Sequence, residues 1–179
     1  TSAVNYLKSK PINAWTAMAL AAAGQSVDVS SLKTLSVTKA TDYEAAIMAL
    51  AAAGKDPRTY PTTDYVAALK GLVSANQIGD ATILNDDAFG ILALRAAGVS
   101  VSDTAITGAK EFLLNHQSAD GGWSFSVSGT SDTNTTAAAI MALIEAGVAK
   151  TDLSISKATT YLKSAQNTDG GFTYDPQSQ

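Results

Sequence analysis

The fold of this chain is decided by the stretch Ala109–Gly147, whose sequence is AKEFLLNHQSADGGWSFSVSGTSDTNTTAAAIMALIEAG. Its first part has the apolar spacing of an amphipathic helix that ends at Gln117. A turn follows at Asp120–Trp123, and the apolar run Thr136–Gly147 has the composition of a buried helix. Such a unit cannot bury its apolar surface alone and needs neighbours of the same kind.

Copies of this unit recur along the sequence. A shift of 49 residues places Gln117 on Gln166 and the turn Asp120–Trp123 on Asp169–Phe172. The Ala-rich part is present as Ala17–Gly24, Ile47–Gly54, Ile91–Gly98 and Ile140–Gly147. Each copy is rich in helix-forming Ala, Leu or Met and ends in a glycine, which suits a left-handed helix C-terminus. We therefore expect Ala-rich inner helices that are buried by stacked neighbours.

Outer helices are expected between the inner ones. In chain order the predicted helices are Thr1–Lys10, Ile12–Gly24, Val29–Ser36, Asp42–Gly54, Asp64–Gln77, Asp86–Gly98, Ser102–Gln117, Thr133–Gly147 and Ser154–Gln166. Both ends of the sequence cut through the repeat. We therefore expect residues 1–179 to form one domain that is part of a longer protein.

Charge and composition exclude several classes of protein. The 179 residues carry a formal net charge of −4 with scattered Lys and Arg, which argues against a nucleic-acid partner. No apolar run approaches the roughly 20 residues of a membrane-spanning helix. Cysteine is absent, so disulfides and thiolate metal sites are excluded. Loops rich in Ser, Thr, Asn and Asp, such as Ser124–Thr136, favour a secreted or cell-surface protein.

Gln117 followed by Gly122-Trp123, after a helix that carries Phe112-Leu113, resembles the QW repeat of the terpenoid cyclase and protein prenyltransferase superfamily. Gln166–Phe172 is a weaker copy, and Asp132–Ala137 is similar to prenyltransferase and squalene oxidase repeats. The resemblance implies an all-α fold, an α/α toroid in which inner helices surround a central cavity and outer helices surround them. Here we expect a partial ring of about four to five inner/outer helix pairs.

The resemblance also implies roles for the repeat residues. In the superfamily, the glutamine amide ties adjacent outer-helix ends together and the aromatic residue packs over it. This carry-over makes Gln117, Trp123, Gln166 and Phe172 structural braces, which is reasonable because a helix end leaves unpaired carbonyls. The lone His116 lies at the same helix end, where we expect it to cap the helix.

The candidate ligand site lies where the N-terminal ends of the inner helices meet. Aligning these helices on their terminal glycines brings one set of residues to a common rim: Asn13, Trp15, Asp42, Tyr43, Asp86, Asp87, Asn134 and Thr135. In superfamily enzymes this end holds catalytic or metal-binding groups, and helix N-termini also favour anions. The alternative is that the Asp and Asn side chains cap backbone N–H groups.

Asp86-Asp87 resembles the last two carboxylates of the cyclase acid motif Asp-x-Asp-Asp, with Leu84 in place of the first. Aromatic residues that would stabilise a carbocation are few near the inner-helix ends. The zinc site of a prenyltransferase needs Cys and His, and a thioester domain needs Cys, so both are excluded. No loop has EF-hand spacing. We therefore expect no metal, no cofactor and no catalytic residue, with Asp86 and Asp87 as the acid of an alternative, enzymatic interpretation.

Three functions remain open. The first is a non-catalytic binding or structural module of a secreted or cell-surface protein, with a small molecule or a protein as its partner. The others are a terpenoid cyclase-like enzyme and a cobalamin-carrier-like domain. A deep aromatic cavity would favour an isoprenoid ligand, a shallow polar mouth a carrier, and an Ala-filled centre a structural role. Apolar edges left by an incomplete ring also favour a homodimer.

Overall fold

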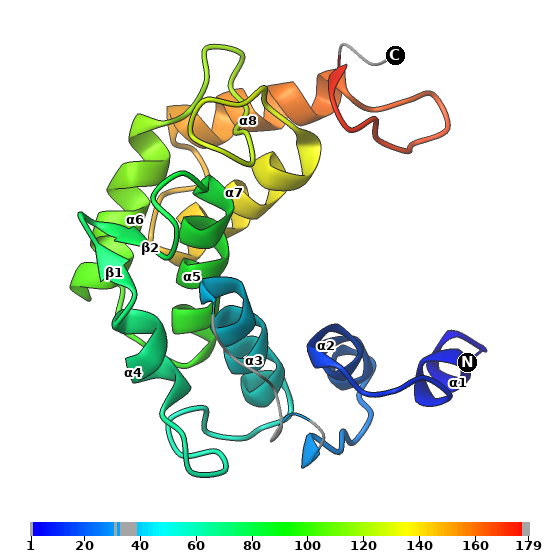
Figure 1. Ribbon diagram of the computed structural model, residues 1–179. Coiled ribbons are helices and arrows are strands. Elements are labelled where there is room, and N and C mark those ends of the chain that lie inside the picture. Colours follow the sequence, from blue (N-terminus) through cyan, green and yellow to red (C-terminus); the bar gives the residue numbers. More distant parts are fainter. Residues whose placement is uncertain (1, 31, 33–38, 177–179) are drawn as a thin grey trace.

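The computed structural model describes residues 2–30, 32 and 39–176, which form helices, loops and one short β-hairpin (Figure 1). In chain order the elements are α1 Ser2–Lys8, α2 Ala14–Ala22, α3 Ala40–Ala52, α4 Tyr65–Lys70, β1 Val73–Ser74, β2 Gln77–Ile78, α5 Leu84–Ala96, α6 Thr104–Asn115, α7 Thr133–Glu145 and α8 Leu153–Ser164. The predicted helix Val29–Ser36 falls largely outside the described residues. None of the described helices has the length and apolar character needed to cross a membrane.

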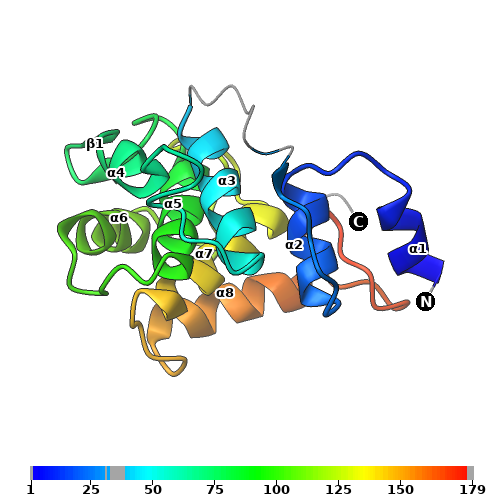
Figure 2. The same cartoon turned by 90° about the horizontal axis from the view of Figure 1, so that it is seen from below.

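The helices form two layers of an open ring. The inner layer is the row α2, α3, α5 and α7, in which each helix packs against the next. In Figure 2, α2, α3 and α5 stand side by side. On the outer side α4 packs on α3, α6 on α5 and α8 on α7, while α1 contacts α2. The arc is open on the side where both chain ends lie (Figure 1). This arrangement confirms the predicted all-α, α/α toroid fold.

The inner helices end in the same way, as their sequences predict. The glycine after each helix has a φ between +69° and +89°, at Gly24, Gly54, Gly98 and Gly147. At each of them the glycine N–H and the N–H of the next residue bond back to carbonyls of the last turn. This pairing satisfies helix-end carbonyls and requires the left-handed conformation that glycine adopts without strain. The last turns are therefore set by local chemistry.

Small side chains hold the inner helices close together. Ala17 of α2, Ala49 of α3, Ala93 of α5 and Ala142 of α7 are fully buried. Larger residues of the same helices, such as Ile91, are also fully buried. The alanines therefore let neighbouring inner helices approach closely, and the larger residues keep the layer densely packed.

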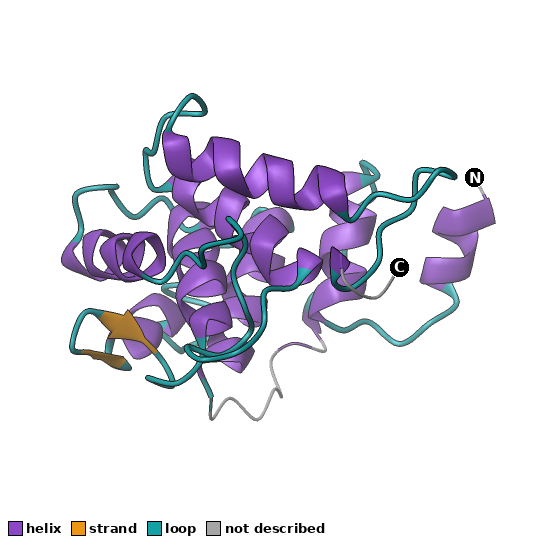
Figure 3. Ribbon diagram, turned by 90° about the horizontal axis from the view of Figure 1, so that it is seen from above, coloured by secondary structure: helices purple, strands orange, loops and turns teal. Residues whose placement is uncertain are grey.

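The predicted outer helix Asp64–Gln77 is wrong beyond Lys70. The helix ends at Gly71, and β1 and β2 form an antiparallel hairpin at the margin of the helical layers (Figure 3). Its two-residue turn has left-handed backbone angles, with φ of +49° at Ala75 and +66° at Asn76. The hairpin places Ile78, which is fully buried, against Gly90 of α5. A Cβ at Gly90 would lie 2.7 Å from Ile78 Cδ1, so this tertiary contact depends on glycine.

The brace that was predicted for Gln117 is present. Its amide Nε2 donates to Gly121 O and to Ser154 O, both at 2.8 Å, and so ties the end of α6 to the first turn of α8. In the second copy, Gln166 Nε2 donates to Gly170 O at 3.2 Å, within its own turn. Phe172 is 54 % exposed, so this copy braces less than the prediction implied.

The ring nitrogen Nδ1 of His116 lies 2.8 Å from Phe112 O, and the His116 N–H bonds to Leu113 O. His116 is the C-cap residue of α6. Its side chain therefore interacts with a carbonyl near the helix end, as predicted.

We expect Gln117→Leu to lower the free energy of unfolding by about 1–3 kcal/mol, because the carbonyls of Gly121 and Ser154 lose a partly buried donor. Gln166→Leu is the matched control, since it removes one exposed contact and should cost less than about 0.5 kcal/mol. Urea denaturation of both variants measures the difference. Equal losses for the two variants would contradict the inter-helix role of Gln117.

Candidate functional site at the inner-helix rim

Two of the predicted rim residues cap their own helices. Asn13 Oδ1 accepts the N–H of Thr16 at 2.9 Å at the start of α2. Asp42 Oδ2 accepts the N–H of Lys39 at 3.2 Å, because α3 begins at Ala40 rather than at Asp42 as predicted. The capping alternative therefore accounts for the positions of both side chains.

Two further residues face the interior of the wall. Thr135 donates its N–H and its hydroxyl to the carboxylate of Asp132, at 2.7 and 2.9 Å, and is buried. The Tyr43 ring packs edge-on against Tyr65 of α4, with the ring centroids 6.4 Å apart. The half-buried Tyr43 therefore packs between α3 and α4, and Thr135 is held at the start of α7 by its N-cap residue Asp132.

Trp15 and Asn134 lie on a different surface, the inner face. We use this name for the partly exposed side of the inner layer that carries Trp15, Met48, Phe89 and Met141. Trp15 is 59 % exposed there, beside Phe89. Asn134 and Met141 line a pocket of about 350 Å³ further along it, together with Phe89. The inner face therefore carries exposed aromatic and methionine side chains, and is not the Ala-filled centre that a purely structural role would favour.

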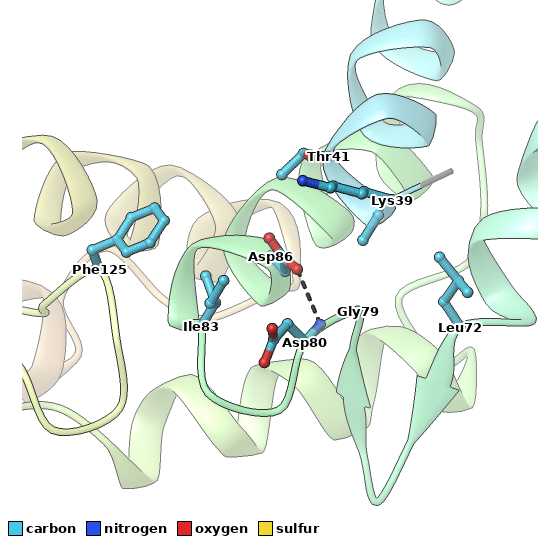
Figure 4. Close-up of a pocket in the computed structure, with 9 residues that line it drawn as sticks. Lys39, Thr41, Leu72, Gly79, Asp80, Ile83, Asp86 and Phe125 are labelled. Atoms are coloured by element: carbon cyan, nitrogen blue, oxygen red, sulfur yellow. Dashed lines mark hydrogen bonds between the residues drawn. The ribbon is translucent and has the colours of Figure 1, made fainter. Parts of the chain in front are cut away.

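A larger pocket of about 510 Å³ opens at the rim itself, between the starts of α3 and α5 (Figure 4). We call it the rim pocket; its lining is Lys39, Ala40, Thr41, Leu72, Gly79, Asp80, Ile83, Asp86 and Phe125. The apolar wall comes from the hairpin flank, from the residue before α5 and from the loop between α6 and α7. Carboxylates and one ammonium group supply the polar part. Of the eight predicted rim residues, Asp86 is the one in this lining.

Asp86 is 5 % exposed, and its Oδ2 accepts the N–H of Asp80 at 3.0 Å (Figure 4). Burial raises the pKa of Asp86, the hydrogen bond from Asp80 N–H opposes this, and the negative charge of Asp80 adds to it. The pKa of Asp80 is lowered because its carboxylate accepts the N–H and the hydroxyl of Thr82. The pocket therefore holds one ionised carboxylate and one that retains its proton more strongly.

Asp87 points away from the pocket lining and is fully buried. Its Oδ1 accepts the N–H of Ile78 at 2.9 Å, which fastens the hairpin to α5. Burial raises the pKa of Asp87 to about 7, against the hydrogen bonds from Ile78 N–H and the Gln77 side chain. Among the described residues, Oδ2 of Asp87 has no hydrogen-bond partner.

Neither carboxylate caps α5, although the sequence suggested capping. The helix begins at Leu84, two residues before the predicted Asp86, and its N-cap residue Ile83 makes no side-chain cap. The N–H of Leu84 donates instead to Phe125 O at 3.0 Å. A backbone carbonyl of the loop between α6 and α7 thus takes the place of a side-chain cap. The carboxylates of Asp86 and Asp87 instead accept backbone N–H groups of Asp80 and Ile78, in and just after the hairpin.

Sequence reasoning missed Glu44. This residue of α3 is 2 % exposed, and burial together with the charges of Asp86 and Asp87 raises its pKa to about 9. The sequence contains a signal for it: ten residues before the terminal glycine, the other three inner helices carry alanine, at Ala14, Ala88 and Ala137. One acid at an Ala position of a buried repeat is unusual because an ionised carboxylate is costly to bury.

The three acids do not form a metal site. Within residues 2–30, 32 and 39–176, no group of three or more His, Cys, Asp or Glu side chains has the geometry to hold a metal ion. Their arrangement instead concentrates carboxyl groups between α3 and α5, where like charges and burial keep protons bound.

Comparison with known proteins finds a family similarity for the second half of the chain. Residues 91–179 match the family model of the squalene-hopene cyclase C-terminal domain. A search of curated proteins gives no match. The matched segment holds both copies of the Gln-to-aromatic turn. Phe125 is the one residue of the rim-pocket lining within it, and Glu44, Asp86 and Asp87 precede it.

Proposed function

Because residues 91–179 match the squalene-hopene cyclase C-terminal domain and the helices form an α/α toroid, we propose that this chain is a toroid module that binds a small organic molecule at the rim pocket without converting it. The observation that carries the proposal is the mixed lining of a pocket of about 510 Å³, with carboxylates, an ammonium group and an apolar wall together. We also propose a secreted or cell-surface location, on the composition of the loops.

The lining specifies the chemistry of the ligand. The carboxylates of Asp80 and Asp86 accept hydrogen bonds from an amine or hydroxyl group, and the Lys39 ammonium donates to a carboxylate. Leu72, Ile83 and Phe125 cover a short apolar body. A zwitterionic ligand with an aliphatic chain, such as an ω-amino acid, matches this pattern.

Three features favour binding over acid catalysis. Leu84, at the position of the first motif carboxylate, is buried and apolar. The pKa of Asp86 is raised, whereas protonation of an alkene needs a strong acid. Trp15 and Phe89 lie on the inner face and not in the rim pocket, where they would be needed to stabilise a carbocation.

The second candidate is a cyclase-like enzyme that uses this carboxyl cluster as its acid. The observation in its favour is that burial raises the pKa of Asp87 to about 7, so one carboxyl group beside Asp86 keeps a proton near neutral pH. A general acid needs its proton at the working pH. The two candidates predict different outcomes in the same set of variants.

We expect calorimetric titration with ω-amino acids of increasing chain length to find one length that binds saturably. Asp86→Asn and Lys39→Met should each weaken that binding by roughly tenfold or more, because each removes one charged contact. Asp169→Asn, in the exposed turn of the second copy, is the control and should bind as wild type.

The same proteins are then incubated with squalene and with prenyl diphosphates, and the products are analysed by gas chromatography and mass spectrometry. A product that the wild type forms and Asp86→Asn does not would favour the enzyme. Absence of binding by every ω-amino acid would refute the rim-pocket proposal.

A further inference from the structure

A second, smaller cavity of about 70 Å³ lies on the inner face between α2, α3 and α5. Two aromatic rings stand beside it at a right angle: Trp15 and Phe89, with centroids 6.1 Å apart and an interplanar angle of 89°. Thr41 and Asn85 supply polar groups, and Met48 closes one side. It shares Thr41 with the rim pocket, but its other walls are different.

Glu44 lines this cavity and is the acid that the repeat pattern does not explain. Glu44 is 2 % exposed, and among the described residues its Oε1 has no hydrogen-bond partner. A buried carboxyl oxygen without a donor costs free energy, and native proteins rarely keep one. The missing donor has space to arrive from the cavity, because the residues around it leave that volume free.

We infer that this cavity binds an organic ammonium group, with the Trp15 and Phe89 rings packed on the cation and the Glu44 carboxylate as its counter-ion. Aromatic faces attract ammonium groups and do so most strongly when both are shielded from water. A volume of about 70 Å³ accommodates a head group rather than a whole ligand. The exposed side of Trp15 leaves room for the rest of the molecule along the inner face.

An inorganic cation fits this cavity less well. Divalent metal ions prefer several charged oxygen ligands, whereas this cavity offers one carboxyl group, one hydroxyl and one amide beside two aromatic rings and a thioether. The described residues also contain no cluster of acids or imidazoles arranged for a metal. The inference is separate from the rim-pocket proposal, since it rests on Glu44, Trp15 and Phe89, none of which lines the rim pocket.

Binding of the cation should displace the proton of Glu44. Asp86 and Asp87 of α5 are the charged groups that raise its pKa, and α2 carries no titratable side chain. On α4, Tyr65 is neutral because its pKa is raised above 10, and Lys70 is engaged in an ion pair elsewhere. An empty cavity therefore holds a protonated Glu44 at neutral pH, and an occupied one holds the carboxylate.

The test uses choline as the probe and 3,3-dimethylbutan-1-ol, its neutral isostere, as the matched control ligand. Titration calorimetry of the whole chain should show saturable choline binding and no binding of the isostere. The heat should depend on the ionisation enthalpy of the buffer, with about one proton released per choline at pH 7. Affinity should rise as the pH is raised toward 9.

Glu44→Gln should weaken choline binding by roughly tenfold or more and abolish the proton release, and Phe89→Leu should weaken it several-fold. Tyr6→Leu, which alters an exposed aromatic ring on α1, is the control variant and should bind choline as wild type. Circular dichroism checks that each variant is folded.

Equal binding of choline and its isostere, or wild-type choline binding by a folded Glu44→Gln, would overturn the inference. So would the absence of any choline binding. The ω-amino acid that binds the rim pocket should not displace choline, so failure of one proposal leaves the other measurable.

Discussion

The free energy of unfolding is expected to decrease as the pH is raised from about 5 to 9, by an amount on the order of 5 kcal/mol. The cause is the buried carboxyl cluster between α3 and α5. In the folded chain the pKa of Glu44 is about 9, against an ordinary value of 4.5, and that of Asp87 is about 7, against 3.8. The folded state therefore holds protons that the unfolded chain releases at lower pH.

The direction follows from these pKa values. Below the unfolded-state values of both groups, folded and unfolded chains are equally protonated and the full stability is present. As the pH rises, the unfolded chain ionises first, so each pH step favours unfolding. The loss ends for each group once the pH passes its folded pKa, which is about 7 for Asp87 and about 9 for Glu44.

The Glu44→Gln variant tests whether this cluster, and not other titratable groups of the chain, causes the pH dependence of stability. Glutamine has nearly the same shape and no ionisation, so the variant should be more stable than wild type at pH 8 by about 2–4 kcal/mol and nearly equal to it at pH 4.5. Glu111→Gln removes an acid from an exposed position on α6 and is the control.

Urea denaturation at a series of pH values gives the free energy of unfolding as a function of pH for the wild type and for Glu44→Gln. A wild-type curve without a decline between pH 5 and 9, or a Glu44→Gln variant less stable than wild type at pH 8, would show that Glu44 ionises freely in the folded chain.

The fold was predictable because its main features are local. An Ala-rich run that ends in glycine specifies both the close packing of an inner helix and the way it stops, and these hold at Gly24 and Gly147 alike. The outer helix expected to reach Gln77 was not predictable in this way. Its apolar spacing also fits a turn of helix followed by a hairpin, and the choice is made by the contact of Ile78 with Gly90.

The candidate site was predictable only in part. Helix N-termini are expected to gather at one rim of a toroid, and Asp86 lies in the lining of the rim pocket, whereas its role as a ligand-binding residue stays a prediction. Side-chain direction could not be read from the alignment, so Tyr43 and Thr135 were assigned to the rim although they face the interior. Glu44 was missed although it stands where the other three inner helices carry alanine, because the pattern alone does not show that this side chain is buried.

Trp123→Ala should lower the free energy of unfolding by about 3–5 kcal/mol, the range for deletion of a large buried aromatic side chain. Trp123 is fully buried, and its Nε1 donates to Leu113 O, a carbonyl near the end of α6, at 2.8 Å. Its backbone N–H donates to Thr136 Oγ1 of α7 at 2.9 Å. The residue therefore connects an outer helix to the next inner helix.

The Trp123→Phe variant separates the contribution of ring packing to stability from the contribution of the indole hydrogen bond. Phenylalanine keeps most of the ring but removes one of two donors to the Leu113 carbonyl, which still accepts the His116 N–H, so we expect a smaller loss of about 1–2 kcal/mol. Phe172→Ala, at the equivalent position of the second copy, should cost less than about 1 kcal/mol, since that ring is more than half exposed. Chemical denaturation of the three variants should give this order. A loss for Phe172→Ala as large as that for Trp123→Ala would mean that the two copies brace the wall equally, against the difference in burial between their rings.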